Sequence, residues 1–119
     1  MITANQIYDT LANALDGVYT TKYYERIEEQ LPCVYFRESH STIRSSVDLS
    51  YQHEAVQMYC YIEVYGNDLD EIVNTIEATM KSMCFIEELN EMIPNYNPSV
   101  ERISMRFGRV ICEGDTLNE

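Results

Sequence analysis

The chain has 119 residues, enough for a single domain spanning 1–119 and too few for a second catalytic domain. Eight Lys and Arg against 20 Asp and Glu give a net charge of −12, which argues against proteins that grip nucleic acid or anionic membranes by electrostatic attraction. A hydrophobic share of 45% argues against a mostly disordered chain. Ten Tyr beside three Phe and no Trp favour partly apolar, partly hydrated surfaces, as protein interfaces are.

The first predicted element is an amphipathic helix over residues 4–16. Its apolar side chains follow helical spacing: Ile7, Leu11, Ala14 and Leu15. Thr3 is a suitable N-cap, and Gly17 follows the predicted end. The opening ten residues lack the basic end and apolar stretch of a secretory signal, so we expect a soluble protein that is not exported by this route.

The segment after the helix changes to strand-forming residues. Residues 18–24 are β-rich, and the charged residues 25–30 predict a turn or a helical stub. Pro32 precedes a short predicted strand over 33–38. Residues 39–46 are polar, and we expect 39–53 to form a mobile loop or a hairpin.

The clearest predicted strand covers residues 54–65. One set of alternating residues is aliphatic and should face the core: Val56, Met58, Cys60, Ile62 and Val64. The other set is rich in tyrosine: Gln57, Tyr59, Tyr61, Glu63 and Tyr65. Such a face suits neither a full core nor bare surface, so it is a candidate interface. An alternative is that another helix or loop of the chain covers it.

A second helix is predicted after the turn at 66–68. Apolar residues at helical spacing run from Leu69 to about residue 84, and the acids at 68–71 suit helix capping and the positive end of the helix dipole better than a calcium loop. Residues 85–91 either prolong this helix or form a short turn. Pro94 and Pro98 then predict an irregular connection.

The last predicted strand covers residues 100–111. Ile103, Met105 and Phe107 share one face, and Arg102, Ser104 and Arg106 share the other. Gly108 suggests a bulge that changes the side on which Arg109 lies. The polar tail 113–119 is expected to be frayed. Together the elements predict an α+β fold: a mostly antiparallel sheet of about four strands, with helices packed on one face.

No catalytic, metal-binding or cofactor-binding site is predicted. His40 and His53 lie in polar stretches without a neighbouring nucleophile motif, and the four glycines form no phosphate-binding loop. The four cysteines are 24 to 28 residues apart and lack ligand spacing, so we expect reduced thiols, most of them filling the core.

The charges are unevenly distributed along the sequence. Residues 54–91 hold nine acids and only Lys81, whereas the last strand carries Arg102, Arg106 and Arg109. One interpretation is pairing within the chain, with Glu63 bound to Arg102 or Arg106 across neighbouring strands. The other is contact between copies through complementary patches. The candidate interface therefore comprises Tyr59, Tyr61, Glu63, Tyr65, Arg102, Arg106 and Arg109.

The order of these elements resembles the tail terminator and tail-completion proteins of long-tailed bacteriophages. The resemblance follows an N-terminal helix, the strand Pro-Cys-Val-Tyr-Phe-Arg-Glu at 32–38, the strand at 56–65, the helix from 70 ending in Met-Lys-Ser-Met-Cys-Phe, and Arg-Ile-Ser-Met-Arg-Phe at 102–107. Relatives often have Gly before the Phe that follows the helix, where Cys84 stands here.

The resemblance implies a non-enzymatic virion protein of the tail or neck, present in the host cytoplasm during assembly. It implies a homo-oligomeric, often hexameric, ring that caps the tail tube and offers a surface for head joining. Its implied partners are further copies, the tail-tube protein and a head-connector or head-completion protein, with no membrane. DNA would pass through the ring without specific binding. Alternatives are a head-closure or other neck component, or a small ligand-binding or regulatory domain whose tyrosines line a pocket.

Overall fold

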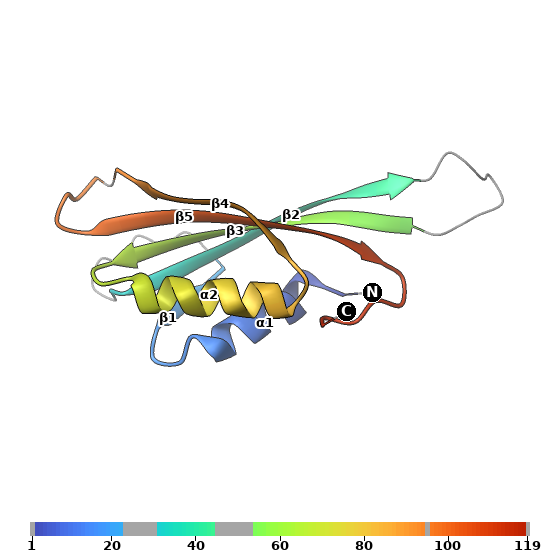
Figure 1. Ribbon diagram of the computed structural model, residues 1–119, viewed down its shortest axis with the longest axis horizontal. Helices are drawn as coiled ribbons and strands as arrows, with labels where there is room; N and C mark the ends of the chain where they lie inside the picture. Colours follow the sequence, from blue (N-terminus) through green and yellow to red (C-terminus); the bar gives the residue numbers. More distant parts are fainter. Residues whose placement is uncertain (1, 23–30, 45–53, 95, 119) are drawn as a thin grey trace.

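The computed structural model describes residues 2–22, 31–44, 54–94 and 96–118. Five strands form one sheet in the order β1-β2-β3-β5-β4, and two helices lie on one side of it (Figure 1). All pairings are antiparallel except β1 with β2. The α+β class and the mostly antiparallel sheet agree with the prediction. The sheet has one strand more than the four expected and is mixed because of β1.

Helix α1 (Ala4–Ala14) begins at the predicted N-cap. The Gln6 backbone N–H donates to Thr3 Oγ1 at 3.3 Å, and the Thr3 backbone N–H donates to Gln6 Oε1 at 2.8 Å. This capping box satisfies two donors that a helix start leaves free. The buried Ile7 and Leu11 then face the sheet, so the predicted helix is confirmed, two residues shorter than expected.

Strand β1 (Tyr19–Thr21) is short and pairs with the start of β2 (Cys33–Arg44). β2 forms a long hairpin with β3 (Glu54–Gly66), and the register pairs Cys33 with Tyr65 and Arg44 with Glu54. Residues 39–44 are therefore strand, and the expectation of a loop there is wrong, whereas the hairpin alternative agrees. Residues 45–53 and the predicted stub at 25–30 lie outside the described residues.

Helix α2 (Asp70–Ser82) buries Val73, Ile76 and Met80. Its N-cap is Leu69, which makes no side-chain cap hydrogen bond, so the predicted capping by the acids at 68–71 is wrong in that respect. Asp70 and Glu71 do lie in the first turn, where the helix dipole favours anions.

The end of α2 is a Schellman motif centred on Cys84. The Cys84 N–H donates to the Lys81 carbonyl at 3.0 Å, and the Phe85 N–H donates to the Met80 carbonyl at 3.0 Å. Cys84 adopts φ +64, the left-handed conformation that usually selects glycine. Cys84 therefore occupies the position after the helix at which glycine is the usual residue.

Strand β4 (Ile86–Ile93) corrects the expectation that residues 85–91 extend the helix or form a turn. It is an edge strand beside β5, and six of its eight residues are exposed. A bulge lies between Glu87 and Leu89.

Strand β5 (Glu101–Cys112) occupies the sheet between β3 and β4. Its pairing with β3 is continuous through Gly108, which lies opposite Tyr59. The predicted bulge at Gly108 is therefore wrong. A Cβ at Gly108 would lie 3.0 Å from Glu88 Oε2 and 3.3 Å from the Tyr59 ring, so the glycine leaves room for these two side chains.

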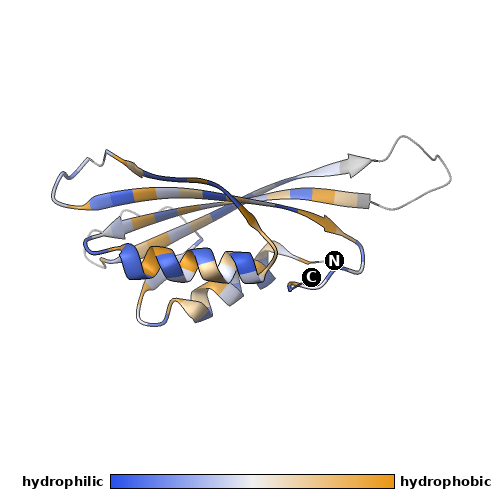
Figure 2. Cartoon of the chain, in the orientation of Figure 1, coloured by the Kyte–Doolittle hydropathy of each residue, from blue (hydrophilic) through white to orange (hydrophobic). Residues whose placement is uncertain are grey.

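The main core lies between the sheet and the two helices. Met58, Cys60, Ile62 and Val64 of β3 are buried there, as predicted, together with Ile103, Met105 and Phe107 of β5. Hydrophobic and hydrophilic residues mix along α2 and along the strands (Figure 2), as expected for elements with one covered face. Neither described helix has the length and apolar character needed to cross a membrane.

Candidate interface on the open sheet face

The sheet face opposite the helices, here called the open face, carries the predicted tyrosines. No described helix or strand lies over it (Figure 1), so Tyr59 and Tyr61 have no covering element among residues 2–22, 31–44, 54–94 and 96–118. The alternative of a covering loop applies only to Tyr65, which is buried with Val100 of the β4–β5 connection packed against its cluster. Paired residues share a face, which gives four rows across β2, β3, β5 and β4. The rows are Cys33, Tyr65, Arg102, Ile93; Tyr35, Glu63, Ser104, Glu91; Arg37, Tyr61, Arg106, Leu89; and Ser39, Tyr59, Gly108, Ile86.

One end of the open face is a small second core. Cys33, Tyr35 and Tyr65 are buried there, with Tyr19 and Val100 packed against them. The Tyr35 and Tyr65 rings meet edge to face with centroids 5.5 Å apart. Burial raises the pKa of the Cys33 thiol, which makes it a poor nucleophile at neutral pH. This end of the face is therefore preorganised by its own packing.

Glu63 has partners within the chain on both carboxylate oxygens. Arg102 forms an ion pair with Oε1, and the Tyr65 hydroxyl donates to Oε2 at 2.9 Å. The Arg102 guanidinium also lies 5.8 Å from the Tyr65 ring centroid. The predicted cross-strand pair of Glu63 with Arg102 is thus confirmed, which favours the intramolecular interpretation for these two charges.

Arg106 pairs with a different carboxylate. Its Nε lies 3.0 Å from Glu88 Oε1, and Glu88 is the bulged residue of β4. The bulge lets an extra acidic side chain reach the open face beside Arg106. Both side chains are partly exposed, so the pair contributes at most about 1 kcal/mol.

Arg37 is the open-face arginine that the sequence analysis missed. Its guanidinium carbon lies 4.1 Å from the centroid of Tyr61, its direct cross-strand neighbour. The described part of the chain gives Arg37 no carboxylate partner, unlike Arg102 and Arg106. The alternation Cys33, Tyr35, Arg37 was the sequence signal that would have placed it on this face.

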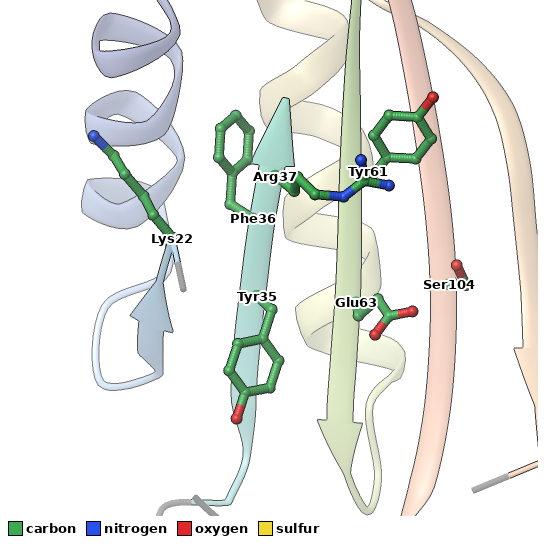
Figure 3. Close-up of a pocket in the computed structure, with 7 residues that line it drawn as sticks. All are labelled: Lys22, Tyr35, Phe36, Arg37, Tyr61, Glu63 and Ser104. Carbon is green, nitrogen blue, oxygen red and sulfur yellow. The ribbon is translucent and has the colours of Figure 1, made fainter. Parts of the chain in front are cut away.

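A shallow hollow of about 210 Å³ lies around Arg37 and Tyr61. Tyr35, Glu63 and Ser104 also line it (Figure 3). Lys22 borders the hollow but points away from Tyr61, bonding Asn5 Oδ1 and lying 4.8 Å from the Tyr8 ring. Since Glu63 is neutralised by Arg102, Arg37 leaves the hollow with a local positive charge on a strongly acidic protein.

Arg109 does not belong to the open face. It is only 6% exposed and lies on the helix side, because the alternation of β5 continues unbroken through Gly108. Its guanidinium donates to the carbonyls of Met83 at 2.6 Å, Leu117 at 2.9 Å and Thr116 at 2.9 Å, and Asp115 lies 3.8 Å away. The prediction that Arg109 contributes to an interface is therefore corrected to a role inside the fold.

The same contacts correct the expectation of a frayed tail. Thr116 and Leu117 are held by Arg109, and Leu117 packs against the main core. The Cys112 N–H also donates to Asp115 Oδ2 at 2.7 Å. Residues 115–117 are thus docked on the domain.

The cysteines divide into two groups. Cys33 and Cys60 are buried, whereas Cys84 and Cys112 are exposed, so the expectation that most fill the core holds for two of four. Burial raises the pKa of Cys60 to about 12. His40 lies in β2 rather than in a loop, with Nδ1 3.0 Å from Glu38 Oε2, and His53 is outside the described residues. Within the described ranges, no group of three or more His, Cys, Asp or Glu side chains is arranged to hold a metal ion.

Compared with known proteins, the sequence matches no protein-family model and no curated protein.

Proposed function

We propose that this protein is a structural component of a phage tail or neck and that its copies assemble into a hexameric ring. It caps the tail tube and provides the tail-side surface for head joining. The tail-tube protein and a head-connector or head-completion protein are its proposed neighbours, in the virion and, during assembly, in the host cytoplasm. We propose no enzymatic activity and no cofactor. The observation that supports assembly best is the open face.

The open face has the composition of a protein interface. Tyr and Arg are the residue types enriched at such surfaces, and Tyr59, Tyr61, Arg37 and Arg106 stand on it in neighbouring rows. Tyrosine rings bring large contact area at low entropic cost, while their hydroxyl groups keep the face soluble before assembly. The net charge of −12 per copy suits a ring through which DNA slides without sticking.

Electron microscopy and analytical sedimentation of the purified chain test the proposal. We expect discrete oligomers, and class averages that show a ring with a central hole. A protein that stays monomeric at all concentrations, with and without tail tubes, would contradict it.

A ligand-binding domain is the second candidate, because Tyr35 and Tyr61 line a hollow. At about 210 Å³ the hollow is smaller than the roughly 300–1,000 Å³ typical of small-molecule sites. A thermal-shift screen separates the two functions, since a specific ligand would raise the melting temperature of the chain with increasing concentration.

A further inference from the structure

Two surfaces on opposite sides of the domain have complementary character. The open face carries Arg37, Arg102 and Arg106, three of the eight basic residues of the chain. The outward surface of α2, on the other side of the sheet (Figure 1), is acidic at its start, where Asp70 and Glu71 are exposed. Glu77 instead accepts a hydrogen bond from Asn90 of β4 at 3.1 Å, and Lys81 is the only base of the helix.

The two surfaces also match in size. A helix of 13 residues is about 20 Å long and about 10 Å wide. Four rows of open-face side chains, each two residues apart, span about 20 Å along the strands, and four strands cover about 14 Å across them. A helix that lies along β3 therefore crosses all four rows and stops short of the ends of the strands, which are 12 and 13 residues long in β5 and β3.

Arg37 is the point where a carboxylate from outside fits best. Stacking on Tyr61 holds the guanidinium plane and leaves its N–H edge for a planar, bidentate partner. The carboxylates of Glu63 and Glu88 are already engaged by Arg102 and Arg106. An incoming acid can therefore bind Arg37 without breaking a pair that stabilises the sheet.

We propose that the open face of one copy binds the acidic outward surface of α2 of a second copy, with Arg37 receiving a carboxylate from that helix. This inference rests on the proposed function, because it needs copies of the chain to assemble. The contact is heterologous, because each copy uses its open face toward one neighbour and its α2 surface toward the other. Such contacts close into a ring when a whole number of rotations from copy to copy makes 360°.

Charge reversal with complementation tests the pairing. The first variant is Arg37→Glu, and the second is Asp70→Lys with Glu71→Lys. Each should remain monomeric under the conditions in which the wild-type chain assembles, because like charges then meet at every contact. A 1:1 mixture should recover assembly, since an acidic open face meets a basic helix at one contact and the native pair forms at the next. Asp16→Lys, on an exposed residue outside both surfaces, is the matched control and should assemble as wild type.

Sedimentation separates failure of this inference from failure of the proposed function. Variants that assemble as wild type, or a mixture that stays monomeric, overturn the pairing and leave the ring proposal standing. A wild-type chain that never assembles overturns both. If the α2 double variant loses its helical circular dichroism, Asn74→Lys with Ala78→Lys replaces it, because these substitutions add positive charge on the same surface and keep the acids of the first turn.

Discussion

Two single residues, Arg109 and Cys84, determine how α2 ends. Arg109 joins the end of α2 to the tail through three backbone carbonyls, although it is a charged residue that is almost fully buried. A buried charge is tolerated only when its donors are used, and a guanidinium can reach several acceptors at once because its donors spread in a plane.

Replacing Arg109 should therefore destabilise the fold. We expect Arg109→Met to lower the free energy of unfolding by about 2–3 kcal/mol, because carbonyls of Met83, Thr116 and Leu117 lose a charged donor. Urea denaturation measures the change, and limited proteolysis should show earlier cleavage in 113–118. Lys81→Met on the exposed side of α2 is the control, with an expected effect within about 0.5 kcal/mol. Equal effects of the two substitutions would contradict this role of Arg109.

Cys84 has a left-handed backbone conformation that is unfavourable for a residue with a side chain. At φ +64 a Cβ is disfavoured by about 1–2 kcal/mol. Glycine avoids this penalty but loses more conformational entropy on folding, so the net gain in stability is smaller than the penalty. Cys84→Gly should thus raise the free energy of unfolding by about 0.5–1 kcal/mol, measured by urea denaturation. Cys112→Gly, at the exposed end of β5, should instead lower it. A loss of stability on Cys84→Gly would show that the Cys84 side chain makes a contribution that outweighs its backbone strain.

At the scale of elements, the sequence predicted those with one buried face and missed those without. The positions of α1, β3 and α2 follow from apolar spacing that packing then uses. The far half of β2 was missed because its side chains there are polar: Ser39, His40, Ser41 and Thr42. β4 was missed for a related reason, since an edge strand with six exposed residues has no apolar periodicity.

The candidate interface was predictable to the extent that strand alternation is regular. Tyr59, Tyr61, Glu63 and Tyr65 share one face of β3, as expected, and Arg102 and Arg106 lie beside them. The expected bulge at Gly108 puts Arg109 on the wrong face, whereas in the structure the missing side chain of Gly108 leaves room for Tyr59 and Glu88. The Glu88 bulge itself could not be foreseen, because bulge position depends on the partner strand.

The edge strand β4 provides a test that depends on pH. Glu87 on its helix side has a raised pKa, first because its carboxyl group is partly desolvated and then because of the nearby charge of Glu77. A carboxyl group whose native pKa is raised costs stability once it ionises, so this cost appears as the pH rises from the ordinary value near 4.5 through the native pKa.

Glu87→Gln should therefore raise the unfolding midpoint at pH 7, and the gain should vanish below about pH 4, where the wild-type carboxyl is protonated in both states. Urea denaturation across this range measures it. Glu101→Gln, an exposed residue at the start of β5, shows how much of the gain comes only from a lower net charge. A gain that persists unchanged at low pH would contradict the ionisation argument.

For the whole molecule, net charge should dominate the response to salt. Four ion pairs are described, two of them partly exposed arginine–glutamate pairs on the open face, against a net charge of −12. Raising the ionic strength from about 0.01 M to about 0.15 M shortens the screening length from about 30 Å to about 8 Å. We expect the melting temperature to rise, because repulsion among the acids is screened more than the close pairs are. Lys81→Glu, more negative by two charges, should respond more steeply, and a fall in melting temperature with salt would show that the ion pairs dominate.

The tyrosines of the open face also provide an intrinsic fluorescence signal for binding at that face. Among the tyrosines in the described ranges, Tyr19, Tyr35, Tyr59, Tyr61 and Tyr65 lie on that side of the sheet. The chain has no tryptophan whose emission would mask theirs. Tyr59 and Tyr61 are only partly buried, so a partner that binds the open face changes their surroundings directly. Intrinsic tyrosine fluorescence can therefore follow docking in real time, without a label and without a substitution.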